Sequence, residues 1–227
     1  MKSNFGKIIK GDYSFQQGEH SGYKLQFIKI REVWNGKNPD DYGILRIFRL
    51  TLVSSLLFFP GVLIDELFRS ASSLTRKLMV ELYVLIKVAM PLVVLVNKWY
   101  LNSFVYYFMI YLLIETYIYL FSKIFLSDQH FKTSTMRTLI LLILNFLESG
   151  LTFSMIYLAG NYLNITPHNV VDAIYYSFVT SSTIGYGDIY PITREGKLIV
   201  VTQILSSISF IVLFFNFFSG KANLQSS

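Results

Sequence analysis

A short polar, glycine-rich stretch separates two long apolar segments in the second half of the chain. The stretch runs Thr180-Ser181-Ser182-Thr183-Ile184-Gly185-Tyr186-Gly187-Asp188, and the apolar segments cover residues 137–160 and 197–219. Each segment is long enough to cross the hydrocarbon core of a bilayer, which takes about 20 residues. A bilayer tolerates non-helical backbone only where protein encloses it or where it lines a water-filled cavity. The stretch therefore predicts cavity-lining backbone within a membrane protein.

The residues around this stretch resemble the pore module of tetrameric potassium channels. The run Thr183-Ile184-Gly185-Tyr186-Gly187 follows an amphipathic segment and precedes Ile189-Tyr190-Pro191 and a further apolar segment. The resemblance covers residues 137–219, a little over a third of the chain. It implies, in chain order, an outer helix at 137–160, a pore helix at 169–181, a selectivity filter and an inner helix at 197–219.

In that family the backbone carbonyl oxygens of the filter replace the hydration shell of a potassium ion. A row of carbonyls that faces one axis requires alternating, partly left-handed backbone dihedrals, which glycine adopts at little cost. Gly185 and Gly187 are therefore expected where other residues would be strained. The resemblance implies that K⁺ binds to the carbonyl oxygens of Thr183, Ile184, Gly185 and Tyr186, and to the Thr183 hydroxyl.

Side chains next to these carbonyls are expected to support the filter. The resemblance implies that the Ile184 side chain points away from the ions into packing. Tyr186 is expected to reach back into an aromatic collar, in which Tyr175 and Tyr176 occupy positions that tryptophan often holds in the family. Asp188 is expected at the outer mouth, where it adds negative potential.

The inner helix carries the residues expected to form a gate. Many family members place a glycine hinge at the position that Ser207 holds here, so bending by glycine flexibility is not expected. Serine can loosen a helix by hydrogen bonding to its own backbone carbonyls. Phe214 and Phe218 are candidates for closing the cytoplasmic end of the pore by dewetting. Ordinary packing against lipid or core is the alternative for these two side chains.

Composition indicates a protein with several membrane-spanning helices. Of the 227 residues, 53% are hydrophobic and 15% are charged, and the mean hydropathy is +0.47. The absence of cysteine excludes disulfides, thiolate metal sites and cysteine nucleophiles. Residues 1–77 hold 12 Lys and Arg against 7 Asp and Glu, which favours a cytoplasmic N-terminal region under the positive-inside rule. The first residues lack an apolar run, so no cleaved signal peptide is expected.

The region before the pore module gives fewer signals. Residues 1–43 are polar, and partial alternation over Lys24–Ile30 predicts a short strand. Residues 44–68 admit two interpretations: a transmembrane helix kinked at Pro60, or an interfacial or re-entrant helix whose arginines face lipid headgroups. An even number of spans must precede the pore if both ends of the chain are cytoplasmic. The two spans expected at 78–97 and 104–126 already meet this condition, so we favour the interfacial or re-entrant helix for residues 44–68. A five-span chain with an external N-terminus is the remaining alternative.

Residues 78–97 and 104–126 are expected to form an antiparallel transmembrane hairpin. Lys87 and Glu115 lie at similar separations from its turn, so the two side chains are expected at similar depth. A charge alone in hydrocarbon is costly, so Lys87 needs a partner, and Glu148 in the outer helix is the alternative one. The group fits either a gating or sensing cluster or a packing ion pair. The regularly spaced basic residues of voltage sensors are missing, so strong voltage sensing is not expected.

These features predict an all-α membrane protein, with a two-helix potassium channel pore module preceded by a transmembrane helical hairpin and an interfacial or re-entrant helix. The expected function is passive, potassium-selective conduction through a homotetramer in the cell membrane. K⁺ is the expected permeant ion, and no organic cofactor, catalytic residue or nucleic-acid partner is expected. The alternatives are a non-conducting regulatory subunit that assembles with other channel chains, and a transporter, which would require inverted repeats. The expected domains are a cytoplasmic N-terminal segment at 1–43, an N-terminal membrane region at 44–126, a cytoplasmic linker at 127–136, the pore domain at 137–219 and a short cytoplasmic tail at 220–227.

Overall fold

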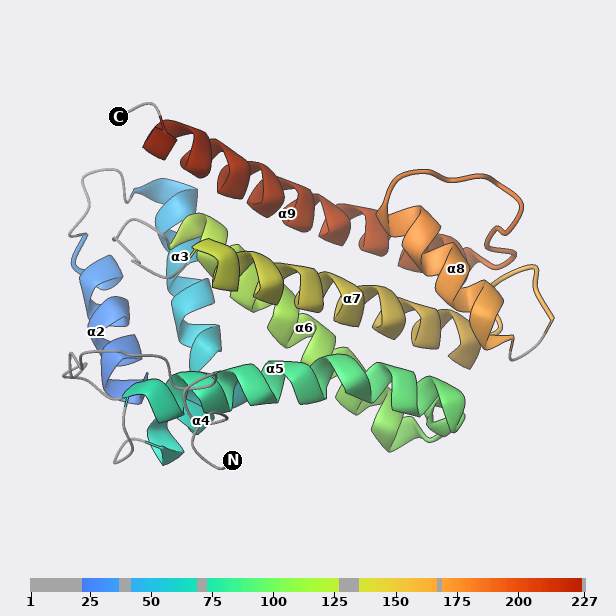
Figure 1. Cartoon of the computed structure of the whole chain (residues 1–227), viewed down its shortest axis with the longest axis horizontal. Helices are drawn as coiled ribbons and strands as arrows, with labels where there is room; N and C mark the ends of the chain where they lie inside the picture. Colours follow the sequence, from blue (N-terminus) through green and yellow to red (C-terminus); the bar gives the residue numbers. More distant parts are fainter. Residues whose placement is uncertain (1–21, 37–41, 69–72, 127–134, 167–168, 226–227) are drawn as a thin grey trace, which may run out of the picture. The chain divides into compact units, whose positions relative to one another are not determined.

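The computed structural model describes residues 22–36, 42–68, 73–126, 135–166 and 169–225. Among these residues every regular element is a helix (Figure 1). Four helices are long and apolar enough to cross a membrane, at Leu78–Val96, Ser103–Ser122, Leu139–Ala159 and Arg194–Phe215. The predicted all-α membrane fold is therefore confirmed. The chain divides into two compact units, Met1–Tyr83 and Val84–Ser227.

The predicted domain boundaries and the side of the membrane on which each segment lies stay predictions. Most of the expected linker at 127–136 falls outside the described residues, as does the first part of the segment at 1–43.

In the described part of the first unit, the strand predicted for Lys24–Ile30 is wrong, because these residues lie within a helix. The elements of this unit are α2 (Gly22–Trp34), α3 (Gly43–Ser55), the 3-10 helix η1 (Leu56–Phe58) and α4 (Pro60–Leu67). Buried and half-buried side chains of α2 include Tyr23, Gln26, Ile30 and Val33, which is helical spacing. This face of α2 explains its contacts with α3 and α4, which a partial alternation over a few residues does not predict.

Residues 44–68 do not form one continuous helix. Phe59 is extended, with φ −102° and ψ 145°, because a proline disfavours the helical conformation for the residue before it. Pro60 then opens α4, where its missing N–H would have no helical acceptor. None of the four candidate spans in the described residues includes this segment. Two shorter helices thus replace the kinked continuous helix, and an interfacial or re-entrant position stays a prediction.

The second unit contains the predicted hairpin, which α5 (Ser73–Val96), the 3-10 helix η2 (Trp99–Leu101) and α6 (Ser103–Phe125) form, with α5 entering this unit at Val84. The chain turns because Lys98 adopts the left-handed conformation, with φ 56°. The Asn102 side chain then caps α6 by accepting a hydrogen bond from the backbone N–H of Phe104 at 2.9 Å. Three further helices complete the unit: α7 (Thr135–Ala159), α8 (Val170–Ser181) and α9 (Arg194–Gln225).

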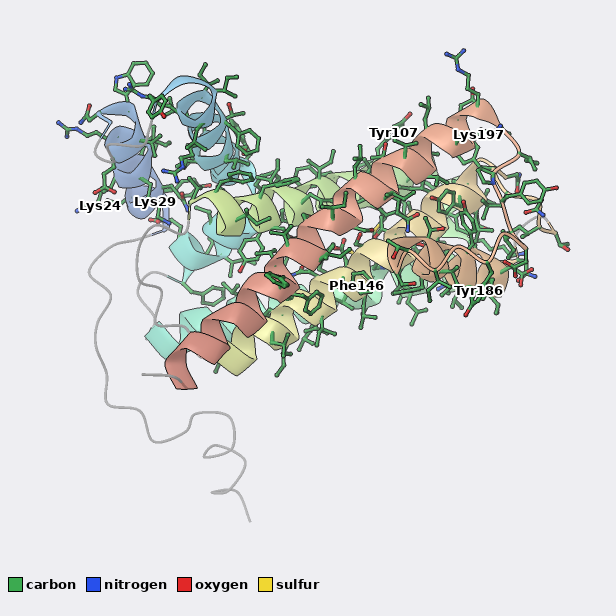
Figure 2. All side chains as sticks on the ribbon, turned by 90° about the horizontal axis from the view of Figure 1, so that it is seen from above. Lys24, Lys29, Tyr107, Phe146, Tyr186 and Lys197 are labelled. Carbon is green, nitrogen blue, oxygen red and sulfur yellow. The ribbon has the colours of Figure 1, made fainter. Side chains whose placement is uncertain are left out.

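Helix α7 contacts α6, α8 and α9 (Figure 1). Phe146 of α7, labelled in Figure 2, meets Phe210 of α9 edge-on with ring centroids 5.4 Å apart. The same ring meets Phe178 of α8 edge-on at 6.1 Å. This aromatic cluster joins the two long helices to the short helix α8, and so positions the loop that follows α8.

Gly150 allows α7 and α8 to approach closely. The Ser177 hydroxyl donates to the Gly150 carbonyl oxygen at 2.7 Å, and a Cβ at residue 150 would lie 2.7 Å from Cζ of Phe178. Gly150→Ala is therefore expected to lower the free energy of unfolding by about 1–3 kcal/mol, because the packed ring must shift. Gly61→Ala is the control, because its added Cβ meets no atom within 4 Å and alanine favours the helix. Chemical unfolding in detergent micelles measures both variants, and equal effects would contradict the close approach.

Candidate functional site

The glycine-rich stretch joins α8 to α9 (Figure 1). Helix α8 begins after Asn169, whose side-chain oxygen accepts a hydrogen bond from the Asp172 backbone N–H at 3.3 Å. The Asn169 amide also donates to the Asp172 carboxylate at 2.6 Å, at the helix end where the dipole favours an acid. The helix ends at Ser181, so the negative end of its dipole lies where the stretch begins.

Left-handed backbone recurs at every second residue of the stretch. Thr183, Gly185 and Gly187 have φ angles of 61°, 58° and 82°. Glycine adopts this conformation without a Cβ penalty, as predicted for Gly185 and Gly187, whereas nothing in the sequence predicts it for Thr183. The Thr183 backbone N–H donates to the Thr180 carbonyl oxygen at 3.1 Å, which holds the start of the stretch against the last turn of α8. The stretch thus has the dihedral alternation that a row of carbonyls facing one axis requires.

Residues 182–188 are exposed on a single chain. The Ile184 side chain is 55% exposed and the Tyr186 side chain is 69% exposed. The packing predicted for Ile184 is therefore not supplied by the described part of its own chain.

One of the two predicted collar tyrosines lies beside Tyr186. The Tyr175 and Tyr186 rings are stacked, with centroids 6.4 Å apart and planes 2° apart, and Figure 2 shows Tyr186 at the loop end of the unit. The Tyr175 hydroxyl donates to the Asp188 carboxylate at 2.9 Å. Tyr176 instead meets Tyr157 of α7 edge-on at 5.1 Å. Successive residues of a helix point about 100° apart, so the two tyrosines face different neighbours in one chain.

The segment before α8 is tied to the segment after the stretch. The Asn164 side-chain oxygen accepts from the Tyr190 backbone N–H at 2.6 Å, and its amide donates to the Asp188 carbonyl oxygen at 3.3 Å. The Ile192 backbone N–H donates to the Tyr162 carbonyl oxygen at 2.9 Å. These bonds hold both ends of the loop together. The role of Asn164 emerges only from the fold, because its two side-chain partners lie 24 and 26 positions later in the chain.

Gln203 of α9 connects α9 with both α8 and α7. Its buried amide nitrogen lies 2.8 Å from the Ser177 carbonyl oxygen and 2.7 Å from Oγ of Ser181. Its amide oxygen accepts a hydrogen bond from the Tyr157 hydroxyl at 2.6 Å. Sequence reasoning missed this residue, although a glutamine in a mostly apolar segment is itself a signal, because such a group needs polar partners.

The predicted gate residues lie on an unbroken helix. Helix α9 continues through Ser207, whose hydroxyl donates to the Gln203 carbonyl oxygen of the preceding turn at 2.9 Å. This is the bonding by which serine loosens a helix. Phe214 packs half-buried against the core, and the side chain of Phe218 lies outside the described residues. The gating role of these residues stays a prediction.

A buried charged group lies where α5, α6 and α7 face one another. Lys87 Nζ lies 3.1 Å from Oε2 of Glu115, which confirms that the two side chains share one depth. Glu148 is fully buried and accepts a hydrogen bond from the Thr116 hydroxyl at 2.7 Å. Of the two acids considered as partners of Lys87, the structure therefore pairs Glu115 with it.

Comparison with known proteins finds relatives for part of the chain. Residues 139–222 match the family described as "Ion channel". Two-pore potassium channel 5 of Arabidopsis thaliana is 37% identical over 78 residues, which are 34% of this chain and 19% of that protein. Two pore potassium channel c of Oryza sativa subsp. japonica is 42% identical over 73 residues, 31% of this chain and 16% of that protein. A hyperpolarization-activated voltage-gated potassium channel of Methanocaldococcus jannaschii is 38% identical over 55 residues, 24% of this chain and 26% of that protein.

The matches cover only part of each protein, and the chain spans less than a fifth of the length of the two plant relatives. No solved structure matches the chain. The ion-channel match, together with four apolar helices of spanning length, shows a multi-pass membrane protein. Residues 139–222, which contain the left-handed alternation, α8 and most of α9, thus match an ion-channel family, and part of the chain is similar to potassium channels.

Proposed function

We propose that the chain is a subunit of a homotetrameric channel that conducts K⁺ passively and selectively across the cell membrane. The observation that carries the proposal is the left-handed backbone at Thr183, Gly185 and Gly187 between α8 and α9. K⁺ loses its water shell only where other oxygens replace it at similar distance. In this proposal the carbonyl oxygens of residues 183–186 and the Thr183 hydroxyl are those ligands.

The exposure of the loop supports an assembly of several copies. One chain supplies one row of carbonyls, which lies on one side of an ion and cannot surround it. Four copies around an axis give each ion a ring of carbonyls, and closed symmetric assembly is the usual form of homo-oligomers. In such an assembly neighbouring copies cover Ile184 and Tyr186, which are 55% and 69% exposed in one chain.

Charge around the loop supports the passage of a cation. The C-terminal end of α8, with its negative dipole end, precedes the loop at Ser181. Asp188 follows the loop and adds negative charge at the proposed outer mouth.

At the other end of the proposed pathway, the proposed gate residues are Ser207, Phe214 and Phe218. The two phenylalanine side chains close the pore by dewetting.

Ion flux from the purified protein in liposomes tests the proposal. With outward K⁺ or Na⁺ gradients, we expect flux of K⁺ and much less flux of Na⁺, and native mass spectrometry is expected to show four copies. Equal fluxes of K⁺ and Na⁺ would overturn the selectivity. No flux from an intact protein across a range of voltages and pH would favour the non-conducting regulatory subunit.

The contact between Tyr175 and Asp188 gives a pH dependence with a defined sign. The hydrogen bond to the Asp188 carboxylate raises the pKa of Tyr175 above its usual value of 10.0. A raised pKa means that the contact is complete below the usual value and is lost only as pH rises through the folded-state pKa. K⁺ flux is therefore expected to show no step from this contact between about pH 7 and 9, and to fall above about pH 10. Tyr175→Phe is expected to show a lower K⁺ flux at neutral pH and no further fall above about pH 10. A fall in flux that persists in this variant would mean that another group causes it.

A further inference from the structure

We propose that Gln203 is a positioning residue that holds the last turn of α8 and thereby sets the geometry of the ion-binding loop. This inference rests on the proposed function, because it assigns the residue a part in selectivity. Gln203 lies on α9, its side chain is fully buried, and it does not belong to the loop itself.

The contacts of Gln203 concentrate on the last turns of α8. Its amide nitrogen lies 2.8 Å from the Ser177 carbonyl oxygen, 2.9 Å from Oγ of Ser177 and 2.7 Å from Oγ of Ser181. Ser181 is the last residue of α8, and Thr183, with its left-handed backbone, follows two positions later. The Gln203 amide is therefore hydrogen-bonded to α8 immediately before the loop begins.

The orientation of the Gln203 amide follows from its partners. The Ser177 carbonyl oxygen only accepts hydrogen bonds, so the group that faces it must be the amide nitrogen. The Ser177 hydroxyl gives its proton to the Gly150 carbonyl oxygen at 2.7 Å, so it too needs a donor from Gln203. The amide oxygen then faces Tyr157, whose hydroxyl donates to it at 2.6 Å. No other orientation satisfies these partners, and one side chain thus ties together α7, α8 and α9.

A second buried amide in the same unit provides the contrast. Asn145 of α7 is 5% exposed, and its amide nitrogen donates to the Leu141 carbonyl oxygen of its own helix at 2.9 Å. Replacing Asn145 by leucine changes a contact within one helix. Replacing Gln203 by methionine, of similar shape, leaves the Ser177 carbonyl oxygen and the Tyr157 hydroxyl without their partner in a buried site, where such groups are costly.

The test compares Gln203→Met, Tyr157→Phe and Asn145→Leu with the wild-type protein by two measurements. The first is the ratio of K⁺ to Na⁺ flux in liposomes. The second is hydrogen exchange of the backbone N–H groups of residues 182–184, of which Ser182 donates to Phe178 and Thr183 to Thr180 in the last turns of α8. Exchange reports on the geometry of the loop whether or not the protein conducts.

We expect Gln203→Met to lower the flux ratio about tenfold and to speed exchange at residues 182–184 about tenfold, because two or three hydrogen bonds are lost. Tyr157→Phe removes one donor and is expected to act in the same direction to a smaller extent. Asn145→Leu is expected to leave both quantities within about twofold of wild type. If Gln203→Met fails to fold, Tyr157→Phe decides by the same readouts.

Wild-type exchange rates at residues 182–184 in Gln203→Met, or in Tyr157→Phe where that variant has to decide, would overturn the inference. So would equal acceleration in Asn145→Leu, which would reduce the effect to general destabilisation. A wild-type protein that conducts Na⁺ as well as K⁺ would instead overturn the proposed function, and the exchange measurement would still decide whether Gln203 positions the loop.

Discussion

Gly185→Ala is expected to reduce K⁺ flux to background while lowering the free energy of unfolding by only about 1–2 kcal/mol. Gly185 has φ 58°, and a Cβ added there would meet no atom within 4 Å in the described part of its own chain. The expected damage is therefore conformational. An alanine at this position favours negative φ, and the relaxation of the backbone turns neighbouring carbonyl groups away from the axis that they are proposed to face.

Gly36→Ala is the matched control for this prediction. Gly36 follows the end of α2 with φ 63°, and its added Cβ also meets no atom within 4 Å. The backbone cost of alanine is therefore similar at the two positions, and only the location differs. Flux in liposomes and chemical unfolding are measured for both variants. Retention of K⁺ flux in Gly185→Ala, or equal loss in Gly36→Ala, would contradict the assignment of the loop as the ion pathway.

Lys87→Met is expected to lower the free energy of unfolding by about 3–5 kcal/mol. The lysine lies 3.1 Å from Glu115, and both side chains are almost fully buried. Glu148 adds a second buried acid, one of whose carboxylate oxygens has no hydrogen-bond partner in the described structure. Removing the cation leaves two carboxyl groups among apolar helices, and a buried charge that has lost its counter-charge is strongly destabilising.

A double-mutant cycle separates the pair from its surroundings. Lys87→Met combined with Glu115→Gln is expected to cost less than the sum of the single changes, because the double variant no longer buries an uncompensated charge. Lys98→Met is the control for loss of a lysine, since Lys98 is exposed in the turn after α5 and its replacement is expected to cost less than about 0.5 kcal/mol. Chemical unfolding in detergent micelles measures all four variants. A cost for Lys87→Met as small as that of Lys98→Met would mean that water reaches the pair.

The spans and the loop were predictable because their signals are local. Apolar length determines where a helix can cross a bilayer, and the predicted hairpin and flanking helices are present within six residues of their expected ends. The left-handed backbone of Gly185 and Gly187 follows from residue type, since only glycine adopts it at little cost. The strand predicted for Lys24–Ile30 failed because a short, partial alternation does not distinguish a strand from a helix that packs against two others.

Partners distant in the chain were harder to predict. A helix that is apolar on all sides does not reveal which face meets which neighbour. The sequence therefore left Glu115 and Glu148 as rival partners of Lys87, and placed Tyr175 and Tyr176 in one collar. In the structure Lys87 pairs with Glu115. The Tyr175 ring stacks on Tyr186, whereas the Tyr176 ring contacts Tyr157.

The sequence by itself determined the membrane class, the order of the helices and the glycine-rich loop, because these depend on apolar length and on the conformations open to single residues. Tertiary structure alone decided the left-handed backbone of Thr183, the pairing of Lys87 and the bonds of Gln203 to Ser177, Ser181 and Tyr157. Those features depend on how helices are rotated about their axes and brought together, so they arise only when distant residues meet.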